Sequence, residues 1–181
     1  MIYVALLRGI NIGPHKRMKM EKLVASCMVC CFKSAKTYIQ SGNVVFEAPR
    51  TACEKLAQRL ETQVLKDFGF SADVVCRTGQ ELETIVSKNP LTKLRSADPA
   101  TFHVAFLREP PSPDAIDKLR SLTLAPDLVE AAEREIYFHF PNGVSGSSLW
   151  KHPLDKVLQV PVTMRNWNTV NQLRRMAGEL G

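Results

Sequence analysis

Residues 37–48 read TYIQSGNVVFEA, and this stretch decides the fold. Two short strand-like runs flank Ser41-Gly42-Asn43, and glycine and asparagine tolerate the positive φ angles that tight hairpin turns require. The stretch therefore predicts a β-hairpin. The segments on either side of this hairpin then determine the topology of the first half of the chain.

A strand and a helix are expected before the hairpin, and a helix and a strand after it. Residues 2–7 form an apolar run, and residues 18–31 carry apolar side chains at helical spacing. Residues 51–68 show the same spacing, and residues 71–76 are again strand-like. This order is β-α-β-β-α-β, the ferredoxin-like unit. A short helix over residues 81–88 follows and ends at a proline.

The second half of the chain begins as the first half does. Residues 102–108, FHVAFLR, match residues 2–8, IYVALLR. A helix over 112–122, a hairpin over 127–140 and a C-terminal helix are expected to follow. The fold class predicted is α+β, with tandem ferredoxin-like (βαββαβ) subdomains and mainly antiparallel sheets. The subdomains expected are 1–90 and 100–181, the second with the C-terminal helix, and the linker region contains Pro90, Ser96 and Pro99.

Composition narrows the class of protein. The chain has 181 residues, 45% of them hydrophobic, which is enough to bury a core without staples. No apolar run approaches the about 20 residues that span a bilayer, and Arg8 ends the first apolar run too early for a signal peptide. We therefore expect a cytoplasmic protein with no membrane partner. The net charge of +6 suits an anionic partner, although a solvated basic surface explains it equally well.

The five cysteines are expected to be reduced. Cys27, Cys30 and Cys31 cluster, but Met20, Leu23, Cys27 and Cys31 follow the spacing of one buried helix face. No second pair of cysteines or histidines lies at zinc-site spacing. The cluster is interpreted as core packing, and the sequence predicts neither a metal nor a cofactor.

Three polar clusters are candidates for a ligand site. They lie after the first strand, in the hairpin turn and at the start of the C-terminal helix. Such side chains can bind an anion, but they are also ordinary turn and helix-cap residues. The candidate ligand-binding residues are Arg8, Asn11, Lys19, Ser41, Asn43, Arg165 and Asn166. No catalytic motif stands out among the acids and histidines, so no catalytic residue is named.

An RNA recognition module is the sharpest alternative for a basic ferredoxin-like unit. Tyr3 occupies the stacking position of the first motif of such modules. However, Asn43 and Val45 stand where the third-strand motif requires stacking rings. The chain therefore lacks some of the aromatic side chains on which RNA bases stack in such modules.

Six motifs follow one another along the chain: YVALLRGINIG, KMEKL, TYIQSGNVVF, NPL, VAFL and TMRNWNTVNQL. Together they resemble the bacterial family called domain of unknown function 1697. The resemblance implies a tandem α+β, ferredoxin-like architecture and no particular reaction. The chain departs from the family pattern at Pro14, where a second loop glycine is common. It departs again at Cys30-Cys31-Phe32, which replaces a leucine-glycine-phenylalanine helix end.

Three functions remain open at this stage. The leading hypothesis is that the candidate residues bind, with or without turnover, a small anionic or phosphate-bearing ligand. The alternatives are a nucleic-acid-binding protein and a protein-interaction module without chemistry. The ligand, the reaction and the oligomeric state do not follow from the residues.

One geometric expectation links the first two polar clusters. In a ferredoxin-like unit the first strand pairs with the third in antiparallel orientation. The end of strand 2–7 then meets the start of strand 44–47. Arg8 and Asn11 are therefore predicted to face the turn at residues 40–43 and to satisfy some of its carbonyl groups.

Overall fold

The computed structural model describes residues 1–94 and 98–181. The chain forms two compact units, one of Met1–Thr84 with Gln172–Gly181 and one of Ile85–Asn171. The subdomain ranges 1–90 and 100–181 stay a prediction. In the structure, the last part of the C-terminal helix groups with the first unit. Ser96, named in the predicted linker, lies outside the described residues.

The first unit contains one βαββαβ motif, followed by a further helix. Its elements are β1 (Ile2–Leu7), α1 (Met20–Val29), β2 (Lys33–Tyr38), β3 (Asn43–Glu47), α2 (Cys53–Phe68), β4 (Val74–Thr78) and the start of α3 (Gly79–Ser87). The strand order is β2-β3-β1-β4, and every neighbouring pair is antiparallel. This is the topology predicted from the hairpin at residues 37–48, and the prediction is confirmed.

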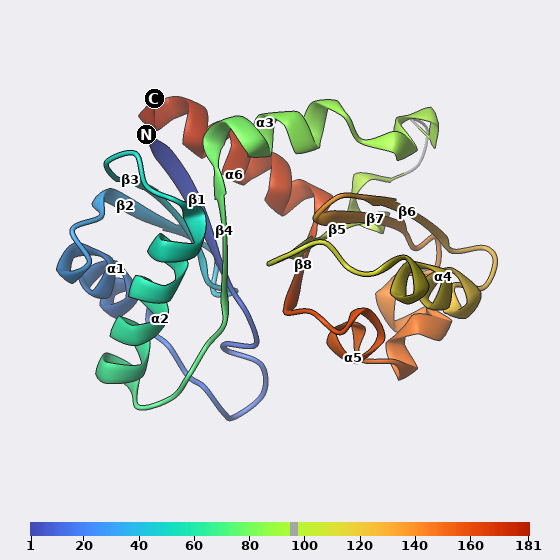
Figure 1. Ribbon diagram of the computed structural model, residues 1–181, viewed down its shortest axis with the longest axis horizontal. Coiled ribbons are helices and arrows are strands. Elements are labelled where there is room, and N and C mark those ends of the chain that lie inside the picture. The colour runs from blue at the N-terminus through green and yellow to red at the C-terminus, as the bar shows by residue number, and fades with distance from the viewer. Residues whose placement is uncertain (95–97) are drawn as a thin grey trace. The chain divides into compact units, whose positions relative to one another are not determined.

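The core of the first unit lies between its sheet and two helices. Because successive side chains of a strand point to opposite faces, Tyr3, Ala5 and Leu7 of β1 share the face that packs into this core. Helices α1 and α2 lie side by side over that face (Figure 1). Leu23 of α1 and Leu60 of α2 are fully buried there. Burying this apolar area is the main source of the unit's stability.

The second unit has the same arrangement, but the connection between its third and fourth strands contains only short helices. Its elements are η1 (Pro90–Leu94), η2 (Pro99–Thr101), β5 (Phe102–Leu107), α4 (Pro113–Leu122), β6 (Leu128–Ala132), β7 (Glu135–His139), η3 (Val144–Gly146), η4 (Ser148–Lys151), α5 (Leu154–Leu158), β8 (Val162–Asn166) and the start of α6 (Trp167–Leu180). The strand order is β6-β7-β5-β8, again antiparallel throughout. The predicted α+β class with tandem ferredoxin-like sheets is therefore observed.

Equivalent backbone bonds show how closely the two halves correspond. The amide of Leu7 donates to the carbonyl of Gly42, and the amide of Leu107 donates to that of Arg134, both one residue before the third strand of the unit. The residue after each first strand, Arg8 or Arg108, donates its amide to the residue before the last strand. The sequence echo thus reflects matching strand ends.

Two local expectations need correction. Strand β2 begins at Lys33, whereas the sequence indicated a start at residue 37. It is an edge strand with exposed polar side chains, so apolar alternation does not mark it. The expectation that Cys31 lies on a buried helix face is wrong, because α1 ends at Val29 and Cys31 is exposed.

None of the helices described in residues 1–94 and 98–181 is both long and apolar enough to cross a membrane.

Candidate functional site

Asn11 ties the loop after β1 to the hairpin turn. Its Nδ2 donates to the carbonyl oxygens of Gln40, at 2.8 Å, and Met18, at 3.0 Å. Its Oδ1 accepts from the amide of Met18 at 2.8 Å. Because Leu6 also lies opposite Asn43 in the β1–β3 register, the loop and the turn stand at the same end of the sheet. The predicted placement of Asn11 against the turn is confirmed.

The positively charged side chains of the loop after β1 differ in their contacts. Arg8 forms an ion pair with Asp73, with 3.2 Å between Nη1 and Oδ2. Lys16 donates to the carbonyl of Ser71 at 2.8 Å. Lys19 is exposed and precedes the first residue of α1. The loop is therefore held to neighbouring segments of the first unit and presents positive charge to solvent.

The turn residues hold one another. Asn43 is fully buried, and its Nδ2 donates to the carbonyl of Tyr38 at 3.0 Å and to Oγ of Ser41 at 2.9 Å. A buried amide requires such partners, since leaving it unsatisfied costs about 1–3 kcal/mol. These contacts give Ser41 and Asn43 a structural role in the turn.

Arg165 and Asn166 belong to the second unit. Oδ1 of Asn166 accepts from the amide of Thr169 at 2.9 Å, which makes Asn166 the N-cap of α6. Arg165 is buried, and its Nη1 donates to Oγ1 of Thr163 at 2.7 Å and to the carbonyl of Met164 at 2.9 Å. Burial lowers the pKa of Arg165 to about 10, so it keeps its charge at neutral pH.

An arginine that the sequence reading missed occupies the equivalent place in the first unit. Arg77 lies opposite Val4, as Arg165 lies opposite Val104, and it is also buried. Its Nη1 donates to the carbonyl of the preceding residue, Cys76, at 2.9 Å. The sequence does contain a signal for Arg77, because the last strand of each repeat carries one arginine.

The seven predicted site residues are thus divided between the units, five in the first and two in the second. Asn11, Ser41, Asn43 and Asn166 make contacts that fold a loop, a turn or a helix end. Their role in ligand binding stays a prediction.

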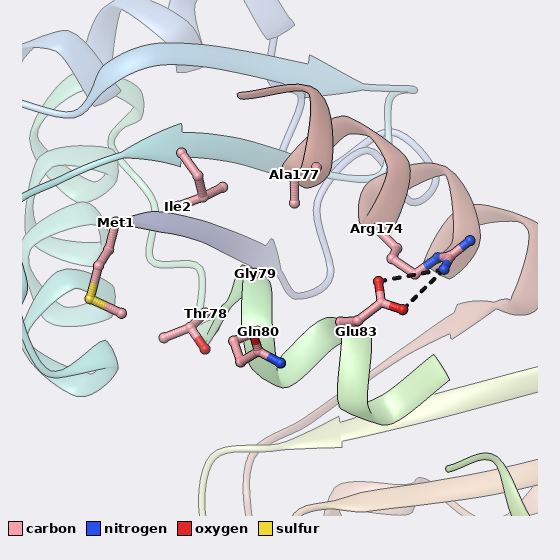
Figure 2. Close-up of a pocket in the computed structure, with 9 residues that line it drawn as sticks. Met1, Ile2, Thr78, Gly79, Gln80, Glu83, Arg174 and Ala177 are labelled. Atoms are coloured by element: carbon pink, nitrogen blue, oxygen red, sulfur yellow. Dashed lines mark hydrogen bonds and ion pairs between the residues drawn. The ribbon is translucent and has the colours of Figure 1, made fainter. Parts of the chain in front are cut away.

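A pocket of about 370 Å³ lies in the first unit, away from these clusters in the sequence. It is lined by the start of β1, the end of β4, the start of α3 and the last turns of α6 (Figure 2). The lining residues are Met1, Ile2, Thr78, Gly79, Gln80, Glu83, Arg174, Ala177 and Gly178. Its volume is at the lower end of the range for small-molecule sites.

The N-terminus of α3 forms one wall of this pocket. The amide of Glu81 donates to Oγ1 of Thr78 at 3.0 Å, and Oε2 of Glu81 accepts from the amide of Thr78 at 2.7 Å. This reciprocal pair is a capping box, which orders the first turn of the helix. Gly79 and Gln80, the first two residues of α3, line the pocket. The positive end of the helix dipole is therefore close to it.

Arg174 is the cation of the pocket. Its Nη1 donates to both carboxylate oxygens of Glu83, at 3.2 and 3.4 Å, as the dashed lines in Figure 2 show. Its Nε is buried and finds no hydrogen-bond partner among the residues that the structure describes. Ile2 and Ala177 add apolar surface. A guanidinium, a helix N-terminus and an apolar wall suit a small anion with a hydrocarbon part.

Sequence reasoning missed this pocket for a physical reason. Its walls come from both ends of the chain, and only the fold brings Ile2 beside Ala177. One signal was local: Thr78-Gly79-Gln80-Glu81 has the spacing of a capping box and marks the start of a helix.

Comparisons with known proteins place the chain by family and by fold. The family model described as protein of unknown function (DUF1697) matches residues 1–137. A solved structure, that of the conserved bacterial protein SP0830 from Streptococcus pneumoniae, is similar with a TM-score of 0.79 and 22% sequence identity. The match covers 97% of this chain and 98% of that chain, and it shows the shared fold. No curated protein matches the sequence.

Proposed function

We propose, for a chain that belongs to the DUF1697 family, that the first unit binds a small anionic ligand in the pocket at Arg174. The ligand carries a carboxylate or phosphate group and a short apolar part. This proposal rests on the position of Arg174. Its side chain lines a pocket beside the N-terminus of α3 and uses only Nη1 for its ion pair with Glu83.

The chemistry of the guanidinium supports an anion at this place. A carboxylate or phosphate prefers to meet two N–H groups of arginine at once. The Arg174 side chain is 40% exposed and donates to Glu83 through Nη1 alone, so its Nη2 is a donor for an anion, whereas its Nε is buried. The backbone N–H groups at the start of α3 and the side-chain amide of Gln80 are further hydrogen-bond donors near the pocket.

The apolar wall supports a hydrocarbon part on the ligand. Ile2 and Ala177 line the pocket, and burying a methylene group against such surface contributes about 0.8 kcal/mol. Glu83 also lines the pocket, and its carboxylate disfavours ligands with several negative charges. Monoanions are therefore expected to bind more tightly than polyanions.

The test is a thermal-shift screen of short monocarboxylates and phosphorylated metabolites, followed by calorimetry of the hits. Arg174→Ala should abolish binding of a hit, or weaken it at least tenfold. Arg175→Ala is the matched control, because Arg175 is the next residue and pairs with Glu179 at 3.8 Å. Surface ion pairs contribute little to stability, so both variants should fold.

The screen also separates this pocket from the site named by the sequence. Lys19→Ala removes one of the exposed cations of the polar loop, the one among the candidate residues named from the sequence. Loss of binding in Lys19→Ala with full binding in Arg174→Ala would move the site to the loop. Equal binding in all variants would reject both places.

Nucleic-acid binding is a second candidate, and the exposed Lys16, Arg17 and Lys19 of the loop favour it. Tyr3 does not contribute a base platform, since it is buried against Phe46 and its hydroxyl donates to the carbonyl of Thr51. Binding to single-stranded RNA should then weaken linearly on a log–log plot against salt, with a slope of about −0.7 per phosphate contacted. Absence of binding at low salt would reject this candidate.

A further inference from the structure

The pocket at Arg174 contains a negative charge beside its positive one. Of the nine lining residues that the structure describes, only Arg174 and Glu83 have charged side chains. These side chains are 40% and 51% exposed, so a ligand can reach both charges. Met1 also lines the pocket, but its ammonium group donates to the carbonyl of Ala48 at 2.9 Å. A ligand that carries only a carboxylate would therefore bring a second negative group to one guanidinium.

We propose that the ligand of this pocket is an α-amino acid with an apolar side chain, whose carboxylate binds Arg174 and whose ammonium group binds Glu83. The assignment rests on the anion site proposed above and names the class of its ligand. Such a zwitterion offers one negative and one positive group, and these complement the two charges of the pocket.

Both charged side chains keep hydrogen-bonding groups for this ligand. Arg174 contacts Glu83 through Nη1, and its Nη2 can donate to a carboxylate. Each oxygen of Glu83 accepts from that one nitrogen, at 3.2 and 3.4 Å, and a carboxylate oxygen can accept a second hydrogen bond from an ammonium group.

The start of α3 supplies further donors for the carboxylate of the ligand. The first N–H groups of a helix have no partner within the helix, and Gly79 and Gln80 of this first turn line the pocket. Gln80 lies three residues before Glu83, so the two side chains are neighbours on the helix surface. The helix therefore places an anion-binding end beside an ammonium-binding carboxylate.

The spacing of the two charges favours an α-amino acid over other zwitterions. The Glu83 oxygens are within 3.4 Å of Nη1 of Arg174, as the dashed lines in Figure 2 show, so the two charged groups of a ligand must also be close together. In an α-amino acid one carbon atom carries both groups. An amine at the far end of the hydrocarbon chain would instead lie against Ile2 and Ala177 and lose its hydration without an ionic partner.

The remaining surface of the pocket suits a short aliphatic side chain. A Cβ added at Gly79 would lie 3.6 Å from the Cβ atoms of both Ile2 and Ala177, so this apolar wall adjoins the start of α3. The volume of about 370 Å³ is at the lower end for small-molecule sites and suits a ligand of this size.

The experiment compares three ligands with the same carbon chain by calorimetry on the full-length protein. Valerate has no amine, norvaline has it next to the carboxylate, and δ-aminovalerate has it at the far end. Norvaline should bind at least about threefold more tightly than either of the others, because it alone can form an additional ion pair with Glu83.

Two variants test the role of Glu83 in this preference. Glu83→Gln should remove the preference, so that norvaline binds no more tightly than valerate. Glu179→Gln is the matched control and should keep it, because Glu179 pairs with Arg175 at 3.8 Å and is not among the lining residues that the structure describes. Each variant loses one exposed ion pair, which contributes little to stability, so both should fold.

The outcomes separate this ligand class from the anion site itself. If valerate binds through Arg174 and norvaline binds no more tightly, the α-amino acid is rejected and the anion site stands. A preference for norvaline that persists in Glu83→Gln also rejects it. If norvaline does not bind at all, the α-amino acid is rejected, and the proposed function falls with it only when the anion screen also finds no ligand.

Discussion

At the scale of single residues, the loop after β1 depends on one asparagine. Asn11 makes three hydrogen bonds that join its own loop to Met18 and to the turn at Gln40. It also has a φ of 54°, in the left-handed region that asparagine tolerates better than most residues. One side chain thus closes the loop and the hairpin end together.

Replacing Asn11 by alanine should destabilise the protein by about 1–3 kcal/mol, because it leaves the Met18 amide and two carbonyls without this partner. Chemical denaturation measures the change. Asn11→Gly is the control, since glycine adopts the same φ without strain and isolates the side-chain bonds. If Asn11→Gly were as stable as the unaltered protein, the three bonds would contribute nothing.

A second residue-scale prediction concerns His103. Burial lowers its pKa below the ordinary value of 6.5, and its Nδ1 has no hydrogen-bond partner in the described part of the chain. The unfolded chain therefore binds a proton at a higher pH than the folded protein does. Stability is complete above about pH 6.5 and falls as the pH drops towards the lower, folded pKa, by at most about 1.4 kcal/mol per pH unit.

Denaturation curves at pH 7.5 and pH 5 check the prediction for His103. His103→Gln should reduce the loss of stability between the two pH values. His152→Gln removes an exposed histidine and should leave the loss unchanged. An equal loss in both variants would assign the pH dependence to other groups.

At the scale of elements, the end of α1 shows a conflict between sequence and geometry. The amide of Phe32 donates to the carbonyl of Cys27, and that of Cys31 donates to Met28, at 2.9 Å each. These bonds form a Schellman motif, in which the residue after the helix cap is usually glycine. Here that residue is Cys31, with a φ of 58°. The helix therefore ends in the usual way with a side chain that the conformation disfavours.

Cys31→Gly should stabilise the protein by about 1 kcal/mol, because glycine removes the cost of the left-handed conformation. The melting temperature measures the gain. Cys31→Ala removes the thiol but keeps a Cβ, so it should bring no comparable gain. A similar increase in both variants would mean that loss of the thiol, and not the backbone, is responsible.

At the scale of the whole molecule, the C-terminal residues complete the first unit. Gln172–Gly181 group with Met1–Thr84. A Cβ added at Gly79 would lie 3.6 Å from the Cβ atoms of both Ala177 and Ile2, which shows how closely these segments pack. Arg174 and Ala177 also form one wall of the proposed ligand pocket.

A chain that ends at Asn171 should therefore lose stability in the first unit and lose the pocket. Leu173 and Ala177 are buried, and burying a leucine alone contributes about 1.5–3 kcal/mol. Hydrogen exchange should become faster in β1 of the truncated protein and should change little in the β6–β7 hairpin of the second unit. Unchanged exchange in β1 would show that the first unit does not need these residues.

The order and type of the elements follow from the sequence itself, because they depend on local chemistry. The turn at Ser41-Gly42-Asn43, the helical spacing in α2 and the repeated strand starting near Val4 and Val104 each act over a few residues. These signals are sufficient to predict the ferredoxin-like topology. Because that topology pairs β1 with β3 in antiparallel orientation, it also predicts that Asn11 lies against the hairpin turn. The start of edge strand β2 at Lys33 was not predicted, because its exposed polar side chains give no apolar alternation.

Only the tertiary structure decided where a pocket forms and what the polar side chains contact. Arg174 lies near one end of the chain and Glu83 near the middle, and no local pattern relates them before the fold does. Hydrogen-bond partners and shared pockets depend on distances between segments remote in sequence, whereas periodicity and turn chemistry report only on neighbours along the chain.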